Sequence, residues 1–115
     1  MSELEGTQAH DAAGTQHGTY EPGVAFYLPG PTGTGFSSEG RGNRAAHFAG
    51  GRLHTAVKEL ADSYSVEFWF WNGLPHDARA VTGYLFSRGA DADSKAAGDH
   101  LGIGGTYRKD LAGKL

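Results

Sequence analysis

Short runs of apolar residues, separated by glycine and proline, recur along the chain from residue 24 onward. Valine, phenylalanine, tyrosine and leucine dominate these runs, and each run is short for a helix. The expected strands are 24–30, two pieces of 44–57 that flank a turn at 50–51, 63–71, 83–89, 100–107 and a last fragment at 111–115. Short strands with turn signals between them are typical of an antiparallel sandwich or barrel, so the predicted class is all-β.

The stretch SYSVEFWFWNGLP, residues 63–75, carries the densest group of large side chains. If its first nine residues form a strand, a period of two separates its faces. One face carries Tyr64, Val66, Phe68 and Phe70, and the other carries Ser63, Ser65, Glu67, Trp69 and Trp71. Burying each large apolar side chain is worth roughly 1.5–3 kcal/mol, so we expect the first face to look into the core.

Length and composition indicate a single domain preceded by a polar segment. The chain has 115 residues, of which 19 are glycine and 38% are hydrophobic. A chain of this size supports one core. Residues 1–19 offer only Met1 and Leu4 as sizeable apolar groups, too few to offset the entropy of ordering. We therefore expect a flexible polar head or linker at 1–19 and the domain at 20–115.

Charge gives no reason to expect nucleic acid or an anionic membrane as a partner. Of the 13 acidic residues, Glu3, Glu5 and Asp11 precede residue 20, which leaves 10 acids against the 10 lysines and arginines of residues 20–115. Such a balanced surface lacks the positive excess that attracts phosphate-rich partners. The sequence also shows no cysteine, no signal-peptide pattern and no apolar run near the ~18 residues that a membrane span needs, so we expect no membrane insertion.

Four segments in succession carry a resemblance to a known family: AAHFAGGRL at 45–53, DSYSVEFWFWNG at 62–73, GYLFSRG at 83–89 and DHLGIGG at 99–105. In this order they resemble the laminin G-like, concanavalin A-like domains of bacterial secreted and surface proteins, over about residues 24–115. The resemblance implies an antiparallel jelly-roll sandwich of two sheets, in an extracytoplasmic or cell-surface part of a larger polypeptide. Such domains continue with a W-H strand and a Y-x-D-G hairpin that do not occur here, so it also implies a domain that is incomplete at its C-terminus.

Trp69, Trp71 and Glu67 are the candidate ligand-binding residues. Two indoles on one strand face could stack on sugar rings while a neighbouring carboxylate binds hydroxyl groups. The alternative is that both indoles pack against another layer or cap a sheet edge. In the resembled family the tryptophan at the Trp69 position is a recurrent part of the fold, which favours this packing role.

An enzyme is not expected. Glu67 raises the idea of glycoside hydrolysis, but the positions two residues away are Ser65 and Trp69, so the strand face offers no second carboxylate. The six histidines form no H-x-x-x-H or H-E-x-x-H pattern. A hydrolase whose acids lie outside this sequence remains a third alternative.

Asp91, Asp93 and Asp99 are candidate calcium ligands. Their carboxylates lie close together in the loop DADSKAAGD, and the resembled domains sometimes hold calcium near such a loop. The EF-hand pattern is excluded because Ala96 stands where the loop requires glycine. A solvated acidic loop without a cofactor is the preferred interpretation. The expected function is a non-catalytic module that recognises a glycan or a protein, with a purely structural spacer as the alternative.

Overall fold

The computed structural model describes residues 3, 5–36, 43–57, 61–90, 95 and 97–115. The chain divides into two compact units, Met1–Ser65 and Val66–Leu115. The described part of the chain contains strands and no helix, and the paired strands run antiparallel. The prediction of an all-β, antiparallel protein is therefore confirmed. The division near residue 65 does not coincide with the boundary expected after residue 19.

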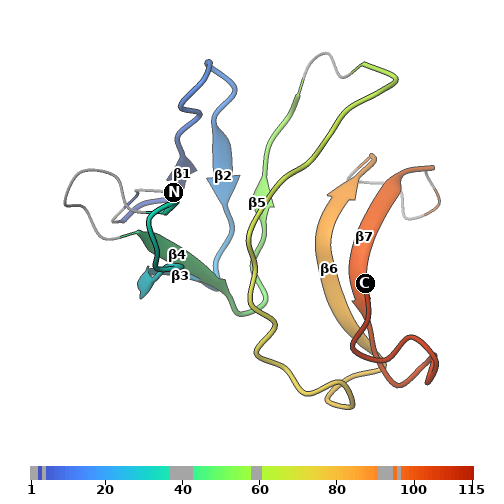
Figure 1. Ribbon diagram of the computed structural model, residues 1–115. Coiled ribbons are helices and arrows are strands. Elements are labelled where there is room, and N and C mark those ends of the chain that lie inside the picture. Colours follow the sequence, from blue (N-terminus) through green and yellow to red (C-terminus); the bar gives the residue numbers. More distant parts are fainter. Residues whose placement is uncertain (1–2, 4, 37–42, 58–60, 91–94, 96) are drawn as a thin grey trace. The chain divides into compact units, whose positions relative to one another are not determined.

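The first unit contains a three-stranded sheet whose order is β1-β2-β5 (Figure 1). Its strands are β1 Gln8–Ala9, β2 Gly18–Tyr20 and β5 Leu53–His54. β1 and the first two residues of β2 lie in 1–19, the segment expected as a flexible head, and the structure pairs them as strands. This pairing is tertiary, because β2 takes a partner on each side although its own residues are largely polar.

The same unit contains a two-stranded sheet of β3 Val24–Pro29 and β4 Arg44–Phe48. Along β3 the residues alternate between half-buried and exposed, as a period of two requires. The register shifts between Ala25 and Leu28, and inside this bulge Tyr27 has a φ of 68°. The Arg44 guanidinium lies 5.9 Å from the centre of the Tyr27 ring, which places a cation–π contact over the bulge.

The two pieces of 44–57 do not form the hairpin that the sequence predicts. Instead β4 pairs with β3, and β5 pairs with β2, so neighbours in sequence belong to different sheets. A close backbone approach accompanies this arrangement. Gly23 has a φ of 97°, and a Cβ placed on it would lie 2.9 Å from the amide nitrogen of Gly51. A Cβ on Gly51 would in turn lie 2.5 Å from the carbonyl oxygen of Pro22.

The second unit is built on an antiparallel hairpin of β6 Val81–Arg88 and β7 Asp99–Gly104 (Figure 1). Two register shifts interrupt the pairing, one between Val81 and Gly83 and one between Tyr84 and Phe86. Both strands overlap the predicted strands at 83–89 and 100–107. In the final segment, Ala112 forms a parallel bridge with Gly104.

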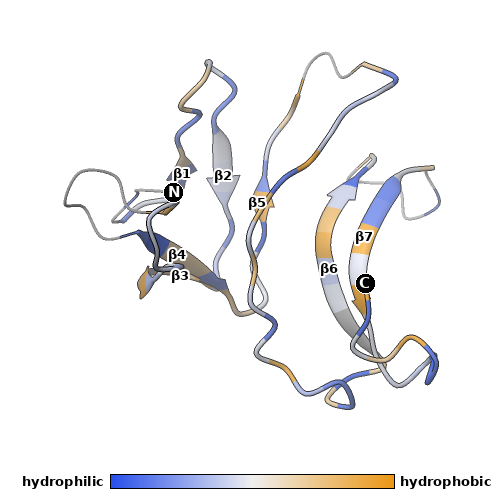
Figure 2. Ribbon diagram, in the orientation of Figure 1, coloured by the Kyte–Doolittle hydropathy of each residue, from blue (hydrophilic) through white to orange (hydrophobic). Residues whose placement is uncertain are grey.

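The buried hydrophobic side chains of the described residues are few. Ala9, Tyr20 and Ile103 are exposed by 9%, 3% and 6%, and Tyr20 contacts Phe26 edge to face at 4.8 Å. Figure 2 shows hydrophobic positions on β5, β6 and β7, and several of these remain accessible, including Leu53 and Leu101. Sheets of two and three short strands offer little area for burial, so each unit has only a small core.

Candidate functional site

The segment at 63–71, which contains the candidate binding residues, forms no strand. It precedes β6 as a plain trace in Figure 1. The prediction of a strand here is wrong, as is the prediction that Val66, Phe68 and Phe70 face a core, because these side chains are exposed by 46%, 38% and 45%. A period of two reports which side chains share a face, whereas a strand also needs a neighbour that pairs its N–H and C=O groups.

A local turn follows the segment. The Asn72 side chain accepts a hydrogen bond from the amide of Leu74 and donates one to the carbonyl oxygen of the same residue, both at 3.3 Å. Asparagine favours this geometry because its short amide imitates a backbone turn. The turn ends the segment at 63–71, which we call the aromatic segment, immediately after Trp71.

Both indoles of the candidate site are open to solvent. Trp69 is exposed by 72% and Trp71 by 93%, and both belong to the second unit. Glu67 is exposed as well. These exposures do not agree with the packing role that the sequence favours for the two tryptophans. Exposed indoles separated by one residue leave a large apolar area in water that a ligand could cover.

The same segment carries further exposed apolar side chains. Phe68 and Phe70 contact one another with ring centres 6.0 Å apart and an interplanar angle of 52°. Together with Val66 they are each exposed by more than a third. The segment thus exposes five large apolar side chains to solvent, which a sugar or a protein partner could cover.

The structure describes only one of the three candidate calcium ligands, Asp99. Asp91 and Asp93 lie outside the described residues. Asp99 begins β7, directly opposite Arg88 in the register of the hairpin, and its carboxylate lies 3.4 Å from the Arg88 guanidinium. Among the described residues, no three His, Cys, Asp or Glu side chains gather as metal ligands. An arginine so close would oppose a second cation at Asp99.

Two clusters that the sequence analysis did not single out are formed by strand pairing. On the β6–β7 hairpin, Ser87 Oγ and His100 Nδ1 are 2.6 Å apart, and the His100 ring lies 5.2 Å from that of Tyr84. Ser87 and His100 are direct partners in register, so the contact follows from the hairpin itself. The strand pattern at 83–89 and 100–107 would reveal this pair once the register was known.

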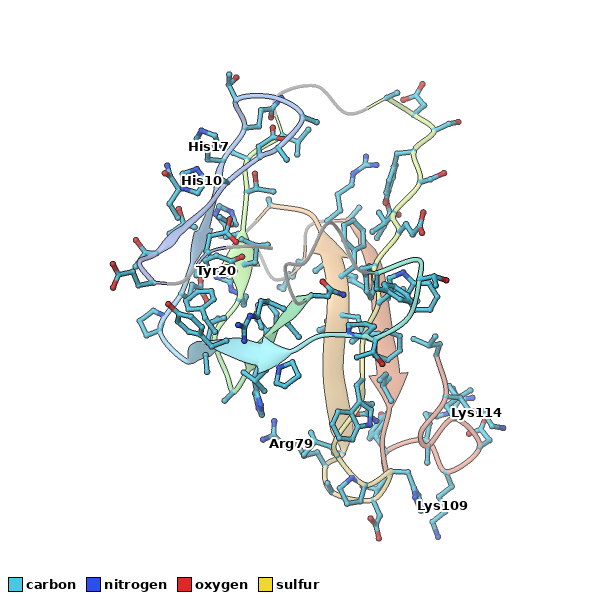
Figure 3. All side chains as sticks on the ribbon, turned by 60° about the vertical axis from the view of Figure 1, so that its left-hand side comes forward. His10, His17, Tyr20, Arg79, Lys109 and Lys114 are labelled. Atoms are coloured by element: carbon cyan, nitrogen blue, oxygen red, sulfur yellow. The ribbon has the colours of Figure 1, made fainter. Side chains whose placement is uncertain are left out.

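The second cluster lies in the loop between β1 and β2. Figure 3 shows His10 and His17 at this hairpin, where their rings meet edge to face with centres 5.4 Å apart. Asp11 stands beside them and accepts several backbone hydrogen bonds. A sequence signal exists in H-D-A-A-G-T-Q-H, where an aspartate precedes a glycine by three residues inside a polar turn.

Comparisons with known proteins add no relative. No family model, no curated protein and no solved structure matches the chain. No helix within the described part of the chain is both long and apolar enough to cross a membrane.

Proposed function

We propose that this protein is a non-catalytic recognition module that binds glycans through Trp69 and Trp71, with Glu67 beside them. The observation that carries the proposal is the exposure of the two indoles, 72% and 93%. Tryptophan side chains are large and apolar, and most proteins keep such area away from water unless it serves a contact.

The chemistry of these three residues fits a sugar. An indole ring can cover the apolar face of a pyranose, and the energy of covering it follows the area removed from water, about 25 cal/mol per Å². The carboxylate of Glu67 is acceptor-only when ionised, so it suits the hydroxyl donors at the rim of a sugar ring. Alternate residues of an extended backbone lie on one side, so in an extended segment residues 67, 69 and 71 would align the acid with both rings.

We further propose the setting in which this surface acts. The four segments quoted above support a laminin G-like, concanavalin A-like jelly roll within a larger extracytoplasmic or surface polypeptide. Antiparallel strands in each unit are compatible with that architecture. A crystal structure of the full protein with two facing antiparallel sheets would support the jelly roll, and a different topology would reject it.

The experiment is a glycan array probed with the wild-type chain, Trp71→Ala and Tyr107→Ala. Tyr107 is a matched control, because it is an aromatic side chain exposed by 82% and lies outside the aromatic segment. We expect Trp71→Ala to weaken binding by at least about tenfold, equivalent to ~1.4 kcal/mol, and Tyr107→Ala to leave it unchanged. Equal signals from wild type and Trp71→Ala would contradict the platform.

A structural spacer is the second candidate, and the exposure of Val66, Phe68 and Phe70 favours it. These side chains would pack against another part of a larger polypeptide rather than against a soluble ligand. The two functions differ in what covers the indoles. Quenching of tryptophan fluorescence by acrylamide should decrease when a bound glycan is added, whereas a spacer would show the same quenching with and without every sugar tested.

A further inference from the structure

The loop that joins β1 to β2 is held by one carboxylate. Asp11 Oδ1 accepts hydrogen bonds from the amides of Ala13 and Gly14 at 2.9 and 3.0 Å, and Oδ2 accepts from the amide of Gln16 at 3.0 Å. A carboxylate that takes several backbone N–H groups fixes a turn strongly, because each bond is charge-assisted. These bonds hold the pKa of Asp11 below its ordinary value of 3.8.

A histidine closes the same loop from the other end. The amide of Asp11 donates a hydrogen bond to His17 Nδ1 at 3.0 Å. Because a nitrogen can accept only with its lone pair, this bond requires a neutral imidazole whose proton is on Nε2. We call the Asp11 carboxylate, the three amides it binds and His17 the Asp11 clasp.

We propose that the Asp11 clasp is an acid-sensitive device that opens in two steps. In the first step a proton occupies His17 Nδ1, the nitrogen can no longer accept, and the amide of Asp11 is released. In the second step, at lower pH, a proton on the Asp11 carboxylate weakens its bonds to the three loop amides. Between the two steps the loop keeps its carboxylate turn but loses the link between its two ends.

Neighbouring charges separate the steps. An imidazolium at His17 attracts the Asp11 carboxylate and contributes to lowering the pKa of Asp11, so the carboxylate stays ionised after the histidine is protonated. The other titratable groups near the clasp are Glu3, whose Oε1 accepts from the amide of His10 at 2.7 Å, the His10 ring against His17, and His54 on the neighbouring strand β5. Since two of these groups are histidines, like His17 itself, the test must assign the first step to one of the three.

The clasp matters because β1 is otherwise weakly held. β1 has two residues, which pair with β2 only at Gln8–Thr19 and Ala9–Gly18. A shallow groove of about 250 Å³ lies against this hairpin, lined by Ala9, His10, Asp11, Gln16, Gly18, Leu53 and Thr55. Most of that lining belongs to the hairpin, so release of the clasp changes the shape of the groove.

The test is a pH titration of the full chain followed by ¹⁵N NMR. We expect the His17 ring in the wild type to show the neutral tautomer with Nδ1 unprotonated near pH 8. The amide signal of Asp11 should shift as the pH falls through the range in which the His17 ring takes up its second proton. Its hydrogen exchange, corrected for the intrinsic pH dependence, should accelerate roughly two- to tenfold over that range. The amides of Ala13, Gly14 and Gln16 should respond only at a pH below the ordinary pKa of an aspartate, because the pKa of Asp11 is lowered.

Matched variants assign each step. His17→Phe should abolish the upper step at the Asp11 amide, and His10→Phe, which changes the neighbouring histidine, should keep it. Asp11→Asn retains an acceptor oxygen without the charge, so it should remove only the lower step. The proposal is overturned if the wild-type ring shows the Nδ1–H tautomer, or if the upper step persists in His17→Phe. The wild-type tautomer gives this answer even where a variant does not fold, and neither readout depends on glycan binding.

Discussion

At the scale of single residues, the hydroxyl of Tyr20 is in an unfavourable place. The side chain is exposed by 3%, and within the described part of the chain its Oη is buried without a hydrogen-bond partner. Such a hydroxyl loses its bonds to water and gains nothing in return. We expect Tyr20→Phe to increase the free energy of unfolding by about 1 kcal/mol, measured by urea denaturation. The exposed Tyr107→Phe is the control and should change it little.

The same residue predicts a response to alkaline pH. Burial raises the pKa of Tyr20 above its ordinary value of 10.0, with a further contribution from the charge of Glu3. The unfolded state therefore loses the phenol proton first, so this contribution to stability is complete below pH 10 and is lost as the pH rises beyond it. The stability of Tyr20→Phe should decline less than that of wild type between pH 10 and 11. Parallel declines would show that Tyr20 ionises freely.

Single residues also show how far sequence reasoning reaches. A period of two predicts that Glu67, Trp69 and Trp71 share one side of an extended segment, whereas the exposure of both indoles is known only from the structure. The Asp11 clasp does not follow in the same way, because His17 and Asp11 meet only when the chain reverses between β1 and β2. Local patterns identify which groups could act, but the contacts depend on turns that bring distant groups together.

At the scale of the element, the apolar runs at 24–30, 83–89 and 100–107 predicted β3, β6 and β7 because those strands are rich in valine, tyrosine, leucine and isoleucine. β1 and β2 escaped prediction because they have two and three residues and little apolar content. The pairing of strands could not be predicted either, because tertiary contacts decide which strands become neighbours. A run such as 63–71 can have the right alternation and still lack a neighbour.

Strand β7 offers a matched pair of positions for a test of the small core. Ile103 is exposed by 6% and Leu101 by 39%, and both belong to the same strand. Removing a buried isoleucine side chain costs roughly 2–5 kcal/mol, and the cost falls with exposure. We expect Ile103→Ala to lower the urea midpoint strongly and Leu101→Ala to lower it much less. Equal shifts would mean that Ile103 does not hold the hairpin.

At the scale of the whole molecule, many large apolar side chains of the described residues are open to solvent. Large side chains that are exposed by at least two thirds are Trp69, Trp71, Tyr84, Tyr107 and Leu115. Apolar area on this scale promotes association. We expect an apolar fluorescent dye to bind the isolated chain, and sedimentation to show association that increases with protein concentration and with sulfate. A dye-free monomer over the whole concentration range would show that this area is covered in solution.

The close approach of Gly23 and Gly51 has a consequence for how the sequence can change. Every single-base missense change of a glycine codon yields a residue that carries a Cβ, and at either position this atom would meet backbone rather than a side chain that can turn away. In a library of random mutants, both codons should therefore tolerate only synonymous changes. The tryptophans, by contrast, could vary widely among folded clones, so the fold and its binding surface are free to evolve at different rates.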